Sequence, residues 1–150
     1  MPQKQATAVW RGNLREGRGE VSTRDAVLKQ VPLSYAQRFG AAPGASPEEL
    51  IAAAHAGCYS MALASNLADQ GYPPDQLTTH ATVTVEIKGG DWTITHSHLR
   101  VEAQVPGIST HTFQDLARYA KEECPVSKAL QRNVDISLDV ALVPVAAQAQ

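Results

Sequence analysis

The 150-residue sequence has no long apolar run, no concentration of basic residues and few aromatic side chains. No stretch reaches the roughly 18 uninterrupted apolar residues of a membrane-spanning helix, so we expect no membrane partner. Lysine and arginine number 13 against 15 acidic residues, without a basic cluster, which argues against nucleic-acid binding. The first seven residues lack the apolar segment of a secretory signal, so we expect a cytoplasmic protein.

Cysteine is also scarce, with only Cys58 and Cys124 in the whole chain. Structural disulfides are rare in the cytoplasm, so a disulfide between these two would be transient and catalytic. Cysteine is often simply a buried packing residue, and the count alone favours that interpretation. The local setting of each cysteine therefore has to decide between packing and chemistry.

The composition, 43% hydrophobic and 19% charged, is that of a folded chain, and the length fits a single domain over residues 1–150. Short apolar runs predict two or three strands within 6–39, followed by a loop at 39–46. Alternating residues predict strands at 81–87, 92–105 and 134–142, with a Gly-Gly turn at 88–91 and a bulge near 96–98. Helical spacing predicts helices at 110–123 and 125–131. This order predicts an α+β fold with mainly antiparallel pairing.

A long helix is predicted between these two groups of strands. Ser46 can cap its first turn, Pro47 suits the first helical position and Glu49 completes a capping box. We expect the helix to run to about Asp69 and to end at Gly71. Small residues cover much of its surface, so we expect a central, buried helix. One side carries the following residues: Leu50, Ala54, Gly57, Cys58, Met61 and Ala64.

The two cysteines have different settings. Cys58 lies in the middle of this helix, where apolar surroundings would raise its pKa unless a cation is near. His55 is one turn earlier, but we expect it to be packed or hydrogen-bonded rather than catalytic. Cys124 precedes Pro125 at the start of a helix, where free N–H groups favour a thiolate. Such a pair suits oxidation of one thiol to a sulfenic acid, disulfide formation with the other and reopening by a dithiol.

Several segments together resemble the OsmC/Ohr family, closest to its OsmC branch, and cover about residues 6–142. They are Val21-Ser-Thr, Ala26-Val-Leu, Arg38-Phe, Ser46-Pro-Glu-Glu-Leu-Ile, Ala53-Ala-His-Ala-Gly-Cys58-Tyr-Ser-Met-Ala-Leu, Val105-Pro-Gly-Ile and Cys124-Pro-Val-Ser-Lys-Ala-Leu. The resemblance implies an OsmC-like fold, with antiparallel sheets wrapped around long central helices in an intertwined homodimer. It implies a peroxidase that reduces organic hydroperoxides in oxidative or osmotic stress defence. It implies a dihydrolipoyl-type dithiol as reductant and no metal, haem or flavin.

The resemblance also implies roles for four residues. Cys58 matches the peroxidatic cysteine and Cys124 the resolving cysteine, which form an intramolecular disulfide during turnover. Glu48 matches the glutamate at the helix start, and Arg38 matches its arginine partner. Arg38 would lower the pKa of Cys58 and orient the peroxide, and Glu48 would fix the guanidinium by a bidentate contact.

One position departs from the Ohr branch, where the active-site arginine lies in the first hairpin. Glu16 occupies that position here, between Arg15 and Arg18, which favours Arg38 as the functional arginine. We expect apolar side chains to line the peroxide path, among them Met61, Tyr59 and Phe39.

Helix geometry constrains how Glu48 serves Cys58. Ten helical residues separate them, a rise of about 15 Å, which a glutamate side chain cannot span. Glu48 therefore acts through an intermediary such as arginine, or it comes from a second chain at an interface. Both possibilities remain open at this point.

Two other functions are compatible with the sequence. A dithiol–disulfide oxidoreductase acting on proteins would also use two thiols, although there is no Cys-x-x-Cys motif. A non-catalytic, stress-induced dimeric binding protein would use the cysteines only for packing. A zinc site is not expected, because only His55 and Cys58 have ligand spacing on a helix. We expect His96 and His98 to be solvated, and Trp10 and Trp92 to lie in the core or an interface.

Overall fold

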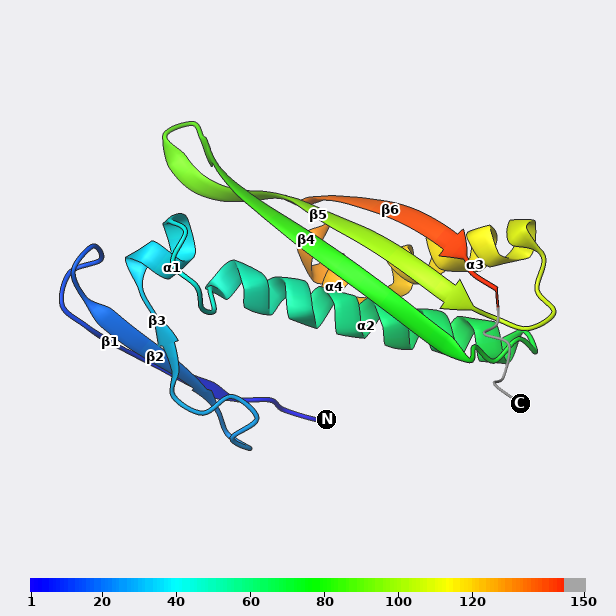
Figure 1. Ribbon diagram of the computed structural model, residues 1–150, viewed down its shortest axis with the longest axis horizontal. Coiled ribbons are helices and arrows are strands. Elements are labelled where there is room, and N and C mark those ends of the chain that lie inside the picture. The colour runs from blue at the N-terminus through cyan, green and yellow to red at the C-terminus, as the bar shows by residue number, and fades with distance from the viewer. Residues whose placement is uncertain (145–150) are drawn as a thin grey trace. The chain divides into compact units, whose positions relative to one another are not determined.

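The computed structural model describes residues 1–144 and folds into two compact units, the first of which is Met1–Leu50 and the second of which begins at Ile51 (Figure 1). The first unit contains β1 (Ala6–Arg11), β2 (Arg18–Thr23), β3 (Val31–Leu33) and α1 (Tyr35–Phe39). The second contains β4 (Gln76–Lys88), β5 (Asp91–Gln104), α3 (Thr110–Glu123), α4 (Pro125–Leu130) and β6 (Asp135–Leu142). Helix α2 (Pro47–Asp69) begins in the first unit and continues into the second. The α+β prediction is confirmed.

The first unit is a three-stranded antiparallel sheet in the order β1-β2-β3, in line with the two or three strands predicted within 6–39. Its Ala26-Val-Leu run is not a strand but part of the connection between β2 and β3, in which Ala26 and Gln30 have φ angles of 56° and 48°. The short helix α1 was not predicted, because five residues are too few to show an apolar period. It is capped by Ser34, whose Oγ accepts the N–H of Gln37 at 3.3 Å.

The second unit is built on a sheet in the order β4-β5-β6. β4 and β5 form an antiparallel hairpin, and the turn uses the positive φ angles of Gly89 and Gly90 (62° and 89°). The register shifts between Thr84 and Val85, close to the predicted bulge. β6 pairs with β5 in parallel, because the chain returns through the crossover formed by α3 and α4.

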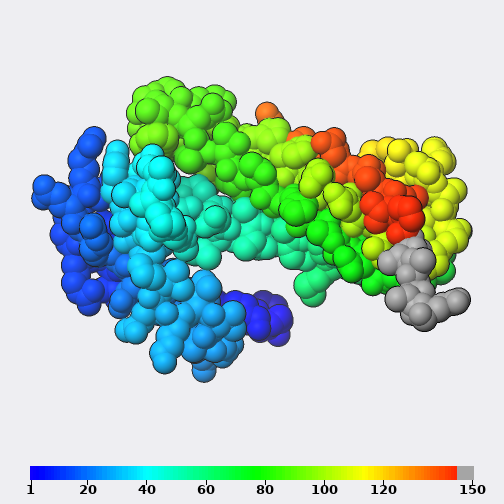
Figure 2. Space-filling view, in the orientation of Figure 1, coloured from blue at the N-terminus to red at the C-terminus, as the bar shows by residue number. Residues whose placement is uncertain are grey.

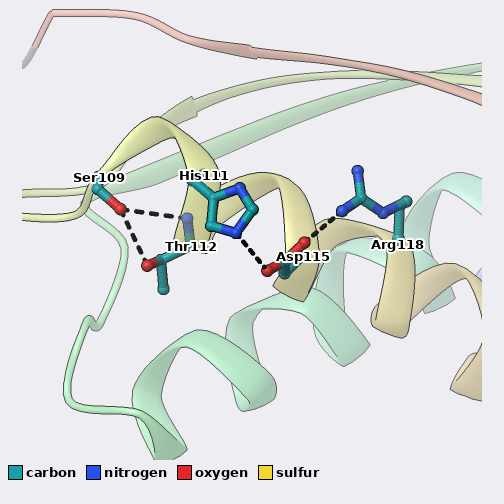
Figure 3. A network of polar contacts seen from close by, with 5 residues as sticks. All are labelled: Ser109, His111, Thr112, Asp115 and Arg118. Atoms are coloured by element: carbon teal, nitrogen blue, oxygen red, sulfur yellow. Dashed lines mark hydrogen bonds and ion pairs between the residues drawn. The ribbon is translucent and has the colours of Figure 1, made fainter.

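Helices α2 and α3 pack on the inner face of this sheet (Figure 1). The fully buried side chains of this core include Tyr59, Leu63, Leu67, Leu99, Val101, Phe113, Ala117 and Ala120. The opposite side of α3 is polar, and Figure 3 shows His111 and Arg118 both paired with Asp115. Figure 3 also shows the cap of α3, where the Oγ of Ser109 accepts the N–H of Thr112 at 3.1 Å. Burial on one side and charge on the other explain why 110–123 was predicted correctly.

Helix α2 has the predicted ends, and one of its sides is buried in this chain. Ser46 Oγ accepts the N–H of Glu49 at 3.1 Å, and the helix ends before Gly71, which has a φ of +87°. Its fully buried residues are His55, Tyr59, Leu63 and Leu67, whereas Met61 is 75% exposed. Within this chain the expected burial is therefore found on one side of the helix only, and it is not the side that carries Ala54, Gly57 and Met61. Alanine and glycine lie on every side of α2, so the apolar pattern does not identify the packed one.

Large apolar side chains remain at the surface. Trp10 is 40% exposed and Trp92 is 49% exposed, so neither belongs to the core, while Ile87 near Trp92 is 63% exposed. Figure 2 shows the tip of the β4–β5 hairpin (green) as a surface lobe. Across residues 1–144, none of the helices combines the length and apolarity that crossing a membrane requires.

Candidate active site

The two cysteines, distant in sequence, lie side by side in the second unit, and both are free thiols. Cys58 on α2 is partly exposed, whereas Cys124 is fully buried. Cys124 ends α3 and begins α4, and its side chain is in hydrogen-bonding contact with the thiol of Cys58. A small reagent from solvent would therefore meet Cys58 first and find Cys124 directly behind it.

The environment of Cys58 has opposing effects on its protonation. Burial raises the pKa of the Cys58 thiol, and the hydrogen bond and charge of Cys124 raise it further. The backbone N–H of Val126, in the first turn of α4, donates to the sulfur and lowers that pKa. We expected this helix start to serve Cys124, and that expectation is wrong, since Cys124 makes no side-chain cap bond to α4.

His55 lies one turn before Cys58 and is completely buried. Its Nδ1 is 2.7 Å from the Oγ of Ser97 on β5, and its Nε2 is 2.8 Å from the Oγ of Ser127 on α4. Burial lowers the pKa of His55, so the ring is neutral near pH 7. The expectation of a packed, hydrogen-bonded histidine is confirmed, and a neutral ring does not supply the cation that Cys58 needs.

Tyr59, next to Cys58 in sequence, points into the core and is fully buried. Its hydroxyl donates to the carbonyl of Ala117 at 3.1 Å. Burial, with a smaller effect from Cys124, raises the pKa of Tyr59, which stays protonated. Tyr59 therefore packs the core and does not line an open path for a peroxide, contrary to our expectation.

Arg38 and Glu48 form an ion pair within the first unit. The Nε and Nη2 of Arg38 lie 3.0 Å and 2.8 Å from the same oxygen, Oε1 of Glu48. Both N–H groups thus share one oxygen, rather than each binding its own as in the expected bidentate pair. Glu48 is 6% exposed, and its Oε2 has no hydrogen-bond partner within residues 1–144. The guanidinium also lies over the ring of Phe39, 4.9 Å from its centroid.

The other two arginines considered from the sequence have different partners. Arg15 lies over the ring of Tyr35, 5.1 Å from the centroid. Arg18 donates to the carbonyl oxygens of Gly17 at 2.8 Å and Glu16 at 3.4 Å. Of these three arginines, Arg38 is therefore the one that pairs with the buried carboxylate of Glu48.

A small pocket of about 140 Å³ adjoins Arg38 in the first unit. Its walls are mostly apolar, and its lining includes Trp10, Leu14, Leu33, Tyr35 and Pro47. This volume is close to that of a cavity of about 150 Å³ that takes up benzene. A pocket with apolar walls and one cation suits a small organic molecule with a polar end.

His96 and His98 are bonded to β6 rather than solvated as we expected. Ser137 Oγ is 2.7 Å from His96 Nε2 and 2.5 Å from His98 Nδ1, and the Nε2 of His98 is 3.1 Å from a carboxylate oxygen of Asp139. Even so, residues 1–144 contain no group of three or more His, Cys, Asp or Glu side chains placed to hold a metal ion.

Three residues near the cysteines were not identified from the sequence: Ser97, Val126 and Ser127. Val126 acts through its backbone, and its side chain gives no signal of this role. Ser97 lies on a different element, 42 positions from His55. Ser127 could have been identified, because it belongs to the Cys124-Pro-Val-Ser segment that contains one of the two cysteines.

Known proteins resemble this chain in sequence and in fold. Residues 40–139 match a family described as OsmC-like protein. Peroxiredoxin OsmC of Escherichia coli is 41% identical over 139 residues, which cover 93% of this chain and 96% of that protein. An organic hydroperoxide resistance protein of Xanthomonas axonopodis is 32% identical over 131 residues, covering 85% and 87%. The crystal structure of an organic hydroperoxide resistance protein from Elizabethkingia anophelis has a TM-score of 0.78 at 26% identity, covering 95% of this chain and 98% of that one.

Proposed function

The chain belongs to the OsmC family, and from that premise we propose that Cys58 and Cys124 are the redox pair of an enzyme that reduces organic hydroperoxides to alcohols. Its enzyme class is that of its relatives, a hydroperoxide peroxidase. The proposal includes an intramolecular disulfide, recycling by a dithiol of the dihydrolipoyl type and a role in oxidative or osmotic stress defence.

The observation that carries this proposal is the contact between a partly exposed Cys58 and a fully buried Cys124. The Cys58 thiolate attacks the distal oxygen of the peroxide, so that the O–O bond breaks and the alcohol leaves with a proton. Cys58 is then a sulfenic acid. The Cys124 thiol attacks that sulfur, forming the disulfide and releasing water. A dithiol reduces the disulfide by exchange and is itself oxidised to a cyclic disulfide.

Activation of Cys58 requires a cation, because burial and Cys124 both raise its pKa. His55 is neutral, so the proposal assigns this role to Arg38, as the family resemblance implies. Glu48 holds the guanidinium through Oε1. Arg38 and Glu48 belong to the first unit, whereas Cys58 and Cys124 belong to the second. The action of Arg38 on the Cys58 thiolate is therefore part of the proposal.

The pocket beside Arg38 supports an organic rather than an inorganic peroxide. Its apolar walls would take up the alkyl or aryl group, while the guanidinium would orient the peroxide oxygens. Hydrogen peroxide has no apolar group and would gain nothing from these walls. Organic hydroperoxides should therefore react faster.

We propose that the working form is a homodimer in the cytoplasm. One side of α2 carries the exposed Met61 and Gly57, and Gly57 has open space around its Cα. A second copy of the same helix could approach closely there. The Oε2 of Glu48, which has no hydrogen-bond partner among the described residues, also supports completion of the site by a group from another chain. The single domain over residues 1–150 stays a prediction.

The test is a thiol count during reaction with peroxide. Reduced protein is mixed with one equivalent of cumene hydroperoxide or, in parallel, hydrogen peroxide, and free thiols are measured against time. Both thiols should disappear quickly, faster with cumene hydroperoxide, and mass spectrometry should find a Cys58–Cys124 disulfide. Cys124→Ser should consume one equivalent of peroxide and then stop, and Cys58→Ser should consume none.

Two other results would replace this proposal. Survival of both thiols for minutes in excess peroxide would mean that the cysteines only pack, as in a non-catalytic dimeric binding protein. Reduction of insulin disulfides without any reaction with hydroperoxides would identify a dithiol–disulfide oxidoreductase.

A further inference from the structure

We infer that His55 is a positioning residue that holds α4 against α2, so that the Cys124 thiol and the Val126 N–H both face Cys58. The imidazole touches neither sulfur in this role and acts through Ser127. The inference rests on the proposed function, because it explains how the disulfide partner and the N–H donor stay in place between reactions.

The contacts of His55 join three elements at one point. The ring projects from α2 and meets Ser97 on β5 through Nδ1 and Ser127 on α4 through Nε2, at 2.7 Å and 2.8 Å. All three residues are at most 1% exposed. A neutral imidazole has one donor nitrogen and one acceptor nitrogen, so one serine accepts a hydrogen bond while the other donates one. The hydroxyl groups of the two serines therefore satisfy the buried ring completely.

Helix α4 needs such an anchor because it is only six residues long, Pro125–Leu130. A helix of this length has little stability of its own and depends on tertiary contacts. The Cys124 thiol and the Val126 N–H, which both act on Cys58, lie at the start of α4. Cys124 comes directly before Pro125, and Val126 comes directly after it. Ser127 is the next residue, so its bond to His55 fixes α4 directly beside these two groups.

The chemistry depends on this placement at two stages. Before oxidation, the Val126 N–H must point at the Cys58 sulfur to stabilise the thiolate. After oxidation, the Cys124 sulfur must approach to a bond length of about 2.05 Å with a narrow range of dihedral angles. If the start of α4 moves away from Cys58, the thiolate is less stable and the disulfide forms more slowly. The sulfenic acid is then exposed to further oxidation for longer.

Ser127→Ala and Ser97→Ala form a matched pair of variants. Each removes one buried hydroxyl bonded to the same ring, but only Ser127 lies on α4. The protein is equilibrated with mixtures of a reduced and an oxidised dithiol, without peroxide, and the Cys58–Cys124 disulfide is quantified. Ser127→Ala should lower the equilibrium constant for disulfide formation at least tenfold, about 30 mV. Ser97→Ala should change it less than threefold.

A second pair of variants acts on the ring itself and serves if Ser127→Ala does not fold. In His55→Asn, the side-chain amide lies near the position of Nδ1 and can still bond Ser97. In His55→Gln, the longer side chain brings the amide to the position of Nε2, where it can still bond Ser127. His55→Gln should retain most of the wild-type equilibrium constant. His55→Asn should lose as much as Ser127→Ala, and trapping with dimedone after one equivalent of cumene hydroperoxide should show a longer-lived sulfenic acid.

Equal losses for the two serine variants, or for the two histidine variants, would overturn the inference and leave His55 as a packing residue only. The thermal unfolding temperature of each variant is measured alongside. A purely structural role of His55 would lower this temperature but would change the equilibrium constant for disulfide formation equally in the two variants of a pair. Failure of the proposed function would look different. The thiols of the wild-type protein would then not react with the peroxide. The equilibrium constant for disulfide formation, measured with the dithiol mixtures, would still differ between the variants as described.

Discussion

Val126 donates its backbone N–H to the sulfur of Cys58, a residue on a different helix. The donor is free to do so because the first N–H groups of a helix have no partner within that helix. The start of α4 therefore supplies Cys58 with a stabilising dipole, and the next cysteine in the chain, Cys124, lies one position before this helix. One short segment thus provides both the hydrogen bond and the disulfide partner.

Replacement of Val126 by proline tests this hydrogen bond. Proline is tolerated in the first turn of a helix, where it removes an N–H that no helical bond uses. Because a hydrogen bond to a charged acceptor contributes roughly 1.5–3 kcal/mol, alkylation of Cys58 at pH 7 should slow by about tenfold or more. The measurement is the pH dependence of alkylation in the Cys124→Ser background. Val126→Ala keeps the N–H and is the control. Equal rates in both variants would show that the bond does not matter.

Arg38 is expected to be the cation that activates Cys58. Arg38→Lys keeps the charge but loses the fork that binds Glu48, so oxidation of Cys58 by cumene hydroperoxide should slow by roughly tenfold or more at pH 7. Glu48→Gln should have an effect in the same direction. Stopped-flow measurement of single-turnover thiol loss provides the rates.

Arg15→Lys and Arg18→Lys are the matched controls for this prediction, since these arginines contact the ring of Tyr35 and backbone carbonyls. Both should react within about twofold of the wild-type rate, as expected of surface substitutions away from the site. A larger loss in either of them than in Arg38→Lys would move the role to the first hairpin.

The buried His55 should make the stability of the fold depend on pH. Its pKa is lowered in the folded state by burial, while the unfolded chain has the ordinary value of 6.5. The unfolded state therefore binds more protons as the pH falls through 6.5, and the free energy of unfolding decreases. Above that value the contribution is fully present. Urea unfolding at pH 7.5 and pH 5.5 should show a smaller decrease for His55→Gln than for the wild type. An identical decrease in both would contradict a neutral His55.

Met61 tests the proposed dimer. It is 75% exposed in this chain, on the side of α2 that carries Gly57. A glutamate there would place a charge in an apolar interface, at a cost of several kcal/mol to association when two such charges meet. Met61→Glu should therefore shift the mass measured by light scattering from dimer to monomer. Tyr119→Glu, at a 55% exposed residue of α3, should leave the mass unchanged. A dimeric Met61→Glu protein would place the interface elsewhere.

The sequence predicted the elements well wherever local chemistry defines them. The cap of Ser46, the proline after it and the positive φ of Gly71 fix the ends of α2 without help from the rest of the fold. Alternation along β4 and β5 and the Gly89-Gly90 turn identified the hairpin, although β4 begins at Gln76, five residues before the predicted start at 81. These signals act between residues at most four positions apart, so they are legible in the sequence.

The sequence by itself thus determined most of the elements, though not the short α1, as well as the two cysteines and, through the Cys-Pro-Val-Ser and Pro-Glu-Glu-Leu segments, the family. Only the tertiary structure decided which side of α2 is buried, because small residues on all sides allow several packings. It also decided that Val126 serves Cys58 and that His55 binds two serines from other elements. The two contacts of His55 join residues 42 and 72 positions apart. The contact of Val126 depends on a backbone N–H, which every residue except proline carries. No local pattern encodes them.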